Sequence, residues 1–168
     1  MSNVEFSLDL VSSRAQSHLL HHNCFAPTIF VVGDIDYEIL AADLSSLNKI
    51  EETVNACRAL AMQVGAKRIY LACLCNTSFD DDASFVETLL IYEWSKEHND
   101  DFCLFRVERR QSDSIFGFQD IKNCANCDEL VPSNFVDMFG QYSCVHGLED
   151  MLERVPASQI RVQTRKIH

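Results

Sequence analysis

Residues 48–75 read NKIEETVNACRALAMQVGAKRIYLACLC and contain the two clearest secondary-structure signals of the chain. The apolar residues of the first part recur at steps of three or four, which places them on one helical face; they are Ile50, Val54, Cys57, Ala61 and Val64. Asn48 is expected to cap this helix in a capping box with Glu51, and Gly65 is expected to end it in a left-handed conformation. We therefore predict a helix over residues 48–64.

The second part, from Arg68 to Cys75, is a short apolar run without alternation. Such a run is typical of a strand that is covered on both faces, so we expect it near the centre of a sheet. Strand, helix and strand follow one another here and suggest a βαβ crossover. That crossover would be right-handed if its two strands were parallel.

Toward the N-terminus, the spacing of Leu8, Val11, Ala15 and Leu19 predicts a helix over residues 7–22. Pro27 stops helical continuation, and the β-branched and aromatic residues that follow it predict a strand. A turn and a second extended segment come next, which suggests a hairpin. The two strands of this hairpin are predicted at residues 28–32 and 37–43.

Toward the C-terminus the predicted elements are shorter. Four extended segments and one helix are expected there by composition and alternation. The strands are predicted at residues 86–94, 102–109, 115–118 and 158–164, and the helix at residues 148–155, where Pro156 ends it.

These elements together predict an α+β fold. We expect a mixed or antiparallel sheet of four to six strands, packed by two helices, over residues 1–121. The character of the sequence changes near Lys122, so residues 122–168 are interpreted as a small C-terminal appendage. A zinc ion would organise this appendage if the cysteines discussed below bind one.

The charge balance of the chain argues against a nucleic-acid-binding protein. The chain has 168 residues, with 14 Lys and Arg against 25 Asp and Glu, and a net charge of −11. Direct binding to nucleic acid is disfavoured, because phosphate neutralisation needs a dense basic face. Four basic and no acidic residues lie in residues 154–168, so a basic tail follows a more acidic body.

The expected compartment is the cytoplasm. The N-terminal sequence lacks the basic and apolar regions of a secretory signal, and no apolar stretch is long enough to span a membrane. Several of the eight cysteines lie in apolar runs, as expected of reduced thiols that pack in a core. Cys73 and Cys75 lie in the predicted central strand and are expected to be inert.

The strongest chemical signal is a candidate zinc site. Cys124 and Cys127 are separated by two residues, and Cys144 and His146 follow after a gap of sixteen residues. Two ligands from a tight knuckle and two from a second element suit a tetrahedral structural zinc ion. The alternatives are that these cysteines are ordinary reduced thiols, or that Cys124 and Cys127 form a redox pair, which would normally follow a strand and begin a helix.

Three weaker candidates have simpler structural explanations. Asp34 and Asp36, with Glu38, could hold a hard cation such as magnesium, but Gly-Asp-x-Asp is also ordinary hairpin chemistry. Charged residues on neighbouring strands resemble a nuclease core only faintly, and exposed ladder pairs explain them better; they are Glu87, Glu93, Glu108 and Arg110. His18 and His22 share a helical face, yet they also suit a polar helix end.

For each candidate catalytic set in the sequence, a structural role explains the residues better than a catalytic role. We therefore expect a non-enzymatic interaction or regulatory protein, or a component of a larger assembly, with a protein partner; a homo-oligomer is an alternative. One alternative is a metal-dependent hydrolase or phosphoryl-transfer enzyme that uses Asp34 and Asp36. Another is an acidic mimic of nucleic acid that inhibits a DNA-binding partner.

Overall fold

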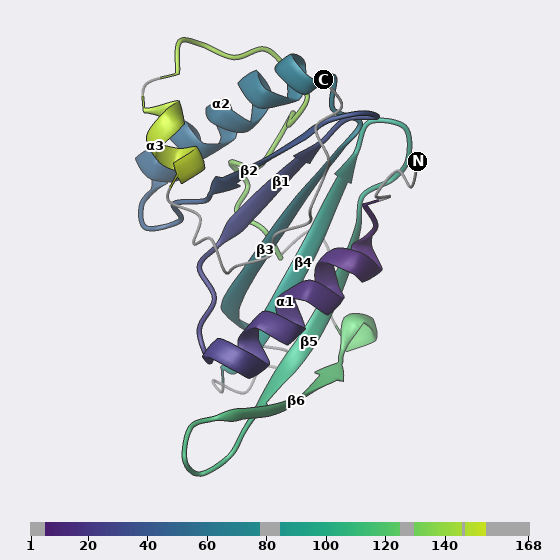
Figure 1. Ribbon diagram of the computed structural model, residues 1–168, viewed down its shortest axis with the longest axis vertical. Coiled ribbons are helices and arrows are strands. Elements are labelled where there is room, and N and C mark those ends of the chain that lie inside the picture. Colours follow the sequence, from purple (N-terminus) through teal and green to yellow (C-terminus); the bar gives the residue numbers. More distant parts are fainter. Residues whose placement is uncertain (1–5, 78–84, 125–129, 146, 154–168) are drawn as a thin grey trace.

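The computed structural model describes residues 6–77, 85–124, 130–145 and 147–153. It contains a six-stranded antiparallel sheet with the order β2-β1-β3-β4-β5-β6. Helix α1 lies across one face of this sheet, and α2 lies on the other face (Figure 1). The predicted α+β class, the antiparallel sheet and the two packing helices are confirmed.

The bounds of most elements agree with the prediction to within one or two residues. In the described part of the chain, no helix is long and apolar enough to cross a membrane. The predicted strand at residues 158–164 lies outside the described residues. The elements are α1 (Leu8–His22), β1 (Thr28–Val32), β2 (Tyr37–Ala41), α2 (Leu47–Val64), β3 (Arg68–Thr77), β4 (Val86–Ser95), β5 (Asp101–Arg109), β6 (Ile115–Asp120), the 3-10 turn η1 (Lys122–Cys124) and α3 (Leu148–Glu153).

Strand β3 is central, as predicted. It pairs with β1 on one side and with β4 along all ten of its residues on the other. Ile69 and Leu71 point toward α2, whereas Tyr70 and Ala72 point toward α1, because successive side chains of a strand alternate between faces. Both sets are buried, which explains the apolar run without alternation.

The predicted βαβ crossover is present, and one further strand lies between its two strands. Strands β2 and β3 each pair antiparallel with β1, so they run in the same direction with β1 between them. The β1–β2 hairpin occupies one edge of β1 and leaves the other edge for β3. Helix α2 therefore carries the chain from β2 across β1 to β3 (Figure 1).

The cap of α2 also differs from the prediction. Ser46 is the N-cap, and its hydroxyl accepts a hydrogen bond of 3.2 Å from the backbone N–H of Lys49. The helix thus begins at Leu47, and Asn48 lies inside its first turn rather than capping it. The expected end is confirmed, since Gly65 adopts a left-handed conformation with φ of 62°.

Gly33 lies where the β1–β2 turn meets the end of α2. Its backbone N–H donates a hydrogen bond of 2.8 Å to the carbonyl of Asp36, which closes the turn. A Cβ at this position would overlap the carbonyl oxygen of Val64, a backbone atom that cannot move without the helix. Only glycine therefore lets the hairpin approach the helix this closely.

We expect Gly33→Ala to lower the free energy of unfolding by about 1–3 kcal/mol, the usual cost of forcing extra volume into a packed site. Chemical denaturation of the purified chain measures this change. Gly117→Ala in β6 is the matched control, because its new Cβ would approach only the flexible carboxylate of Glu108. The control should change stability by less than about 0.5 kcal/mol; equal losses in the two variants would contradict the argument.

Strand β6 forms one edge of the sheet and contains a bulge. Glu108 pairs with Gly117, but the next residue of β5, Arg109, pairs with Ile115, so Phe116 is an extra residue on β6. The extra residue shifts the alternation of the strand by one position. Ile115 and Phe118 therefore pack in the same cluster although they are three residues apart, while Phe116 is 51% exposed.

The described residues that follow β6 contribute to the core on the α2 side of the sheet. Phe135 and Met138 are buried there, and the ring of Phe135 stacks on Trp94 of β4 with the centroids 5.5 Å apart. Helix α2 packs mainly on β1 and β2, so this segment covers a part of the same face beside it. The predicted boundary near Lys122 stays a prediction.

Truncation of the stacked ring tests how strongly this segment supports the core. We expect Phe135→Ala to lower the free energy of unfolding by about 3 kcal/mol, because it removes a buried aromatic ring and leaves a cavity. The neighbouring Val136 is 59% exposed, so Val136→Ala should cost less than about 0.5 kcal/mol. An unfolding transition that is unchanged in Phe135→Ala would identify the segment as a separate appendage.

Candidate functional site

The candidate zinc ligands are only partly covered by the structure. Cys144 is exposed and lies on the segment beside α2. Cys124 ends η1, but its side chain lies outside the description, as do Cys127 and His146 entirely. Within the described residues, no group of three or more His, Cys, Asp or Glu side chains could hold a metal ion. The zinc site therefore stays a prediction.

Metal analysis tests it directly. We expect chain purified without chelators to carry about one zinc ion, since four protein ligands make a structural site. Cys127→Ser should lose the zinc and lower the thermal unfolding temperature, because metal binding stabilises the folded form. Cys24→Ser, an exposed cysteine outside the predicted set, is the control and should retain the metal. Substoichiometric zinc with unchanged folding of Cys127→Ser would end the zinc interpretation.

Asp34 and Asp36 act as hairpin residues. Asp34 forms an ion pair of 2.9 Å with Lys67, which follows α2, and the Asp36 carboxylate accepts a hydrogen bond of 2.9 Å from the backbone N–H of Tyr37. Both aspartates are exposed. Among the described residues they do not converge with a third ligand, so their geometry is that of a stabilised turn.

One charged residue of the predicted strand ladder forms an ion pair with a neighbouring strand. Glu87 pairs with Arg109, with 2.8 Å between the carboxylate and the guanidinium. The same guanidinium donates to the side chain of Asn23, at the end of α1, and to the carbonyl of Asp113. Arg109 therefore ties α1, β4 and the β5–β6 turn together, which is a structural role.

His18 and His22 stack on one another with their ring centroids 4.4 Å apart. His18 also meets Phe25 edge to face at 5.7 Å. These contacts pack the end of α1 against the chain that follows it. They fit the interpretation of a polar helix end.

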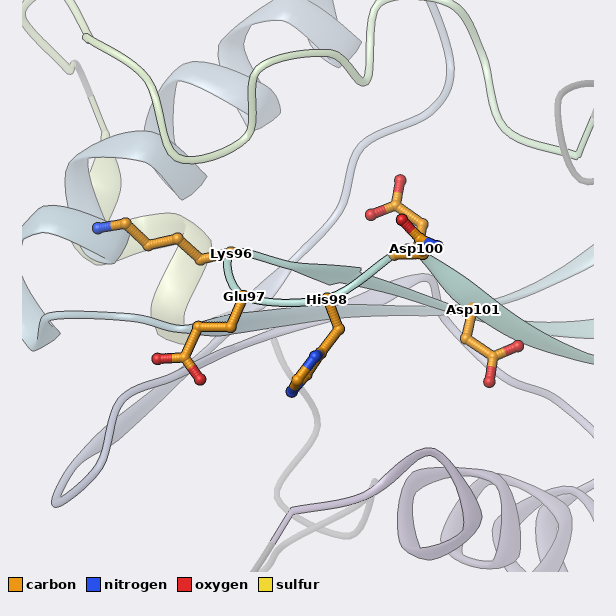
Figure 2. A pocket seen from close by; sticks show the side chains of 6 residues that line it. Lys96, Glu97, His98, Asp100 and Asp101 are labelled. Atoms are coloured by element: carbon orange, nitrogen blue, oxygen red, sulfur yellow. The ribbon is translucent and has the colours of Figure 1, made fainter.

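One surface hollow, of about 700 Å³, lies at the β4–β5 connection, residues 96–101. Figure 2 shows that its side chains point in different directions, with Lys96 to the left, His98 downward and Asp100 upward. A binding site for a small molecule normally has polar groups that converge on a largely apolar cavity. This hollow does not have that arrangement.

A second hollow, of about 500 Å³, lies between the end of β2, the first turns of α2 and α3. Its polar side chains already have partners within the fold. The carboxylate of Asp43 accepts hydrogen bonds from Ser45, and Lys49 pairs with Glu52 at 3.1 Å. These pairs support the local structure of the loop before α2 and of its first turn.

The outer side of α2 contacts a segment that is distant in the sequence. Residues 135–143 are fixed along this helix by side-chain hydrogen bonds. The Arg58 guanidinium donates to the carbonyls of Val136 and Asp137 at 2.6 and 2.8 Å. Asn55 exchanges two hydrogen bonds with the backbone of Ser143, at 2.9 and 3.2 Å.

Exposed apolar side chains lie along this side of α2 and on the segment that it holds. Four of the eight large hydrophobic residues that are exposed in the described chain lie on this side of α2 or on the segment fixed to it. We call this group, with its anchors, the α2 surface; its members are Leu47, Asn55, Arg58, Met62, Val136 and Tyr142. Met62 is 69% exposed and Val136 is 59% exposed, so both present most of their area to solvent. Sequence reasoning missed this surface because the segment has no regular periodicity.

The two cysteines of β3 differ in their surroundings, and their predicted inertness stays a prediction. Cys73 is buried, and its pKa is well above the ordinary value, as expected of an inert thiol. Cys75 is only partly buried, and its pKa is lowered to about 6. The signal that sequence reasoning could not use is the partner strand, which places Thr88 directly opposite Cys75.

Comparisons with protein-family models, with curated proteins and with solved structures found no significant match to the chain. The functional argument therefore depends on the surfaces and side chains described above.

Proposed function

We propose that the protein is a non-enzymatic interaction protein, and that it binds a protein partner through the α2 surface. The observation that carries the proposal is that four exposed apolar side chains lie on one side of α2 and on the segment that Arg58 and Asn55 hold against it. Exposed apolar side chains on one face of a protein can form a site of association.

The composition of the α2 surface supports this function. Met62, Tyr142 and Arg58 belong to residue types that are enriched at protein interfaces. Arg58 is already held by two backbone carbonyls, so its side chain is preorganised. A surface that is ordered before binding loses less conformational entropy when a partner docks.

Site-specific cross-linking tests the proposal. A photoreactive amino acid placed at position 62 should capture a distinct partner in cells that express the chain, whereas the same group at position 20 should not. Leu20 is the matched control because it is also exposed, at 48%, but lies on α1 across the sheet. A lack of a distinct product at position 62, or the same products at both positions, would contradict the proposal.

The captured partner is then purified and its affinity measured by calorimetry. We expect Met62→Glu and Val136→Glu each to weaken binding at least tenfold, about 1.4 kcal/mol, because each buries an unpaired charge in the interface. Leu20→Glu should leave the affinity unchanged within twofold. All three positions are exposed, so the thermal unfolding temperature should stay close to that of the wild type. Equal affinities for all variants would exclude the α2 surface as the binding site.

A further inference from the structure

Residues 140–144 form a short stretch beside α2, which we call the strap. Phe139 and Val145 lie directly before and after the strap, and both pack partly against the core on the α2 side of the sheet. Within the strap, residues 141–144 are exposed. The strap therefore contributes little apolar burial of its own, and its position depends on polar contacts.

One side chain of α2 supplies these polar contacts. The Asn55 side-chain oxygen accepts a hydrogen bond of 2.9 Å from the backbone N–H of Ser143, and its amide nitrogen donates one of 3.2 Å to the carbonyl of the same residue. Among the described residues, no other side chain forms a hydrogen bond with the strap. Both bonds are exposed, so water competes for the same groups and the strap is held only weakly.

A turn separates the strap from the part of the chain that the core holds. The backbone N–H of Gly140 donates a hydrogen bond of 2.9 Å to the carbonyl of Asp137, which has a left-handed φ of 50°. The residues up to this turn are held firmly, because Phe135 and Met138 are buried and the Arg58 guanidinium binds two backbone carbonyls. The strap can therefore leave α2 without moving the core segment.

We infer that Asn55 is a positioning residue of the α2 surface, and that the strap opens and closes at its two hydrogen bonds to Ser143. Tyr142 directly precedes Ser143, so the closed strap fixes Tyr142 beside α2 and the open strap releases it. The inference rests on the proposed function, because the closed strap is the state that binds the partner. A partner that contacts Tyr142 shifts the equilibrium toward this state.

Amide hydrogen exchange of the full-length chain, resolved by residue, tests the opening of the strap. We expect the Ser143 amide to exchange roughly tenfold to a hundredfold more slowly than an unbonded amide, since two exposed hydrogen bonds protect it. Mild denaturant should not change this rate, because local opening exposes little surface. The amide of Leu71 in β3 should instead exchange through global unfolding. An unprotected Ser143 amide, or one that responds to denaturant as Leu71 does, would overturn the inference.

Variants of Asn55 test its role in the same experiment. Asn55→Ala should raise the exchange rate of Ser143 roughly tenfold or more, and Asn55→Asp should retain part of the protection because it keeps the acceptor. Asn48→Ala, at another exposed asparagine of α2, is the control and should leave the rate unchanged. The fluorescence of Trp94, the one tryptophan of the chain, should stay the same in Asn55→Ala, because its stacking on Phe135 is retained. Unchanged exchange of Ser143 or altered Trp94 fluorescence in Asn55→Ala would refute the role of Asn55, and the wild-type exchange remains decisive if the variant fails to fold.

Affinity for the cross-linked partner separates this inference from the proposed function. Asn55→Ala should weaken binding about threefold to tenfold, because a smaller fraction of the chain has the closed strap. Asn55→Asp should restore part of the affinity, and Asn48→Ala should bind as the wild type does. Weaker binding of Met62→Glu with unchanged binding of Asn55→Ala would overturn the inference and leave the proposed function in place. Unchanged binding of Met62→Glu would refute the proposed function, whereas the exchange of Ser143 still decides whether the strap opens.

Discussion

Burial of β3 on both faces is the constraint on which the rest of the structure depends. Five consecutive residues, 69–73, are buried, so each face of the sheet needs its own cover. Helix α1 supplies the cover on one face. On the other face α2 lies over β1 and β2, and the chain near Phe135 and Met138 fills the space beside it. The chain after β6 therefore helps to cover the face of the sheet that α2 leaves open.

Local sequence signals predicted the elements well, because periodicity and capping act within a few residues. The apolar stripe of α2 and the left-handed Gly65 placed that helix to within one residue. The cap itself was misplaced, since Ser46 and Asn48 are both good caps and only the surrounding backbone decides between them. The order of the strands was not predictable in the same way, because it depends on which edge of β1 the hairpin leaves free.

The candidate sites depend on contacts between residues that are distant in the sequence. Thr88 reaches Cys75 from thirteen residues away because of strand register, and Arg58 binds carbonyls almost eighty residues farther along. Single-sequence patterns carry no information on either contact. This is why the contact between Cys75 and Thr88, and the packing of an irregular segment along α2, could not be predicted from the sequence. The zinc ligands, by contrast, are a spacing pattern that sequence can propose and that the described residues leave open.

The bulge at Phe116 affects how readily strands of other chains can add to the edge of the sheet. A straight edge strand presents a regular row of backbone donors and acceptors, to which a strand of any other chain can be added. The extra residue interrupts this row and turns Phe116 outward, where the guanidinium of Arg110 lies 5.6 Å from its ring. A strand arriving at β6 would lose its register after only a few residues. The bulge therefore disfavours the addition of a further strand at β6, and with it open-ended aggregation through this edge.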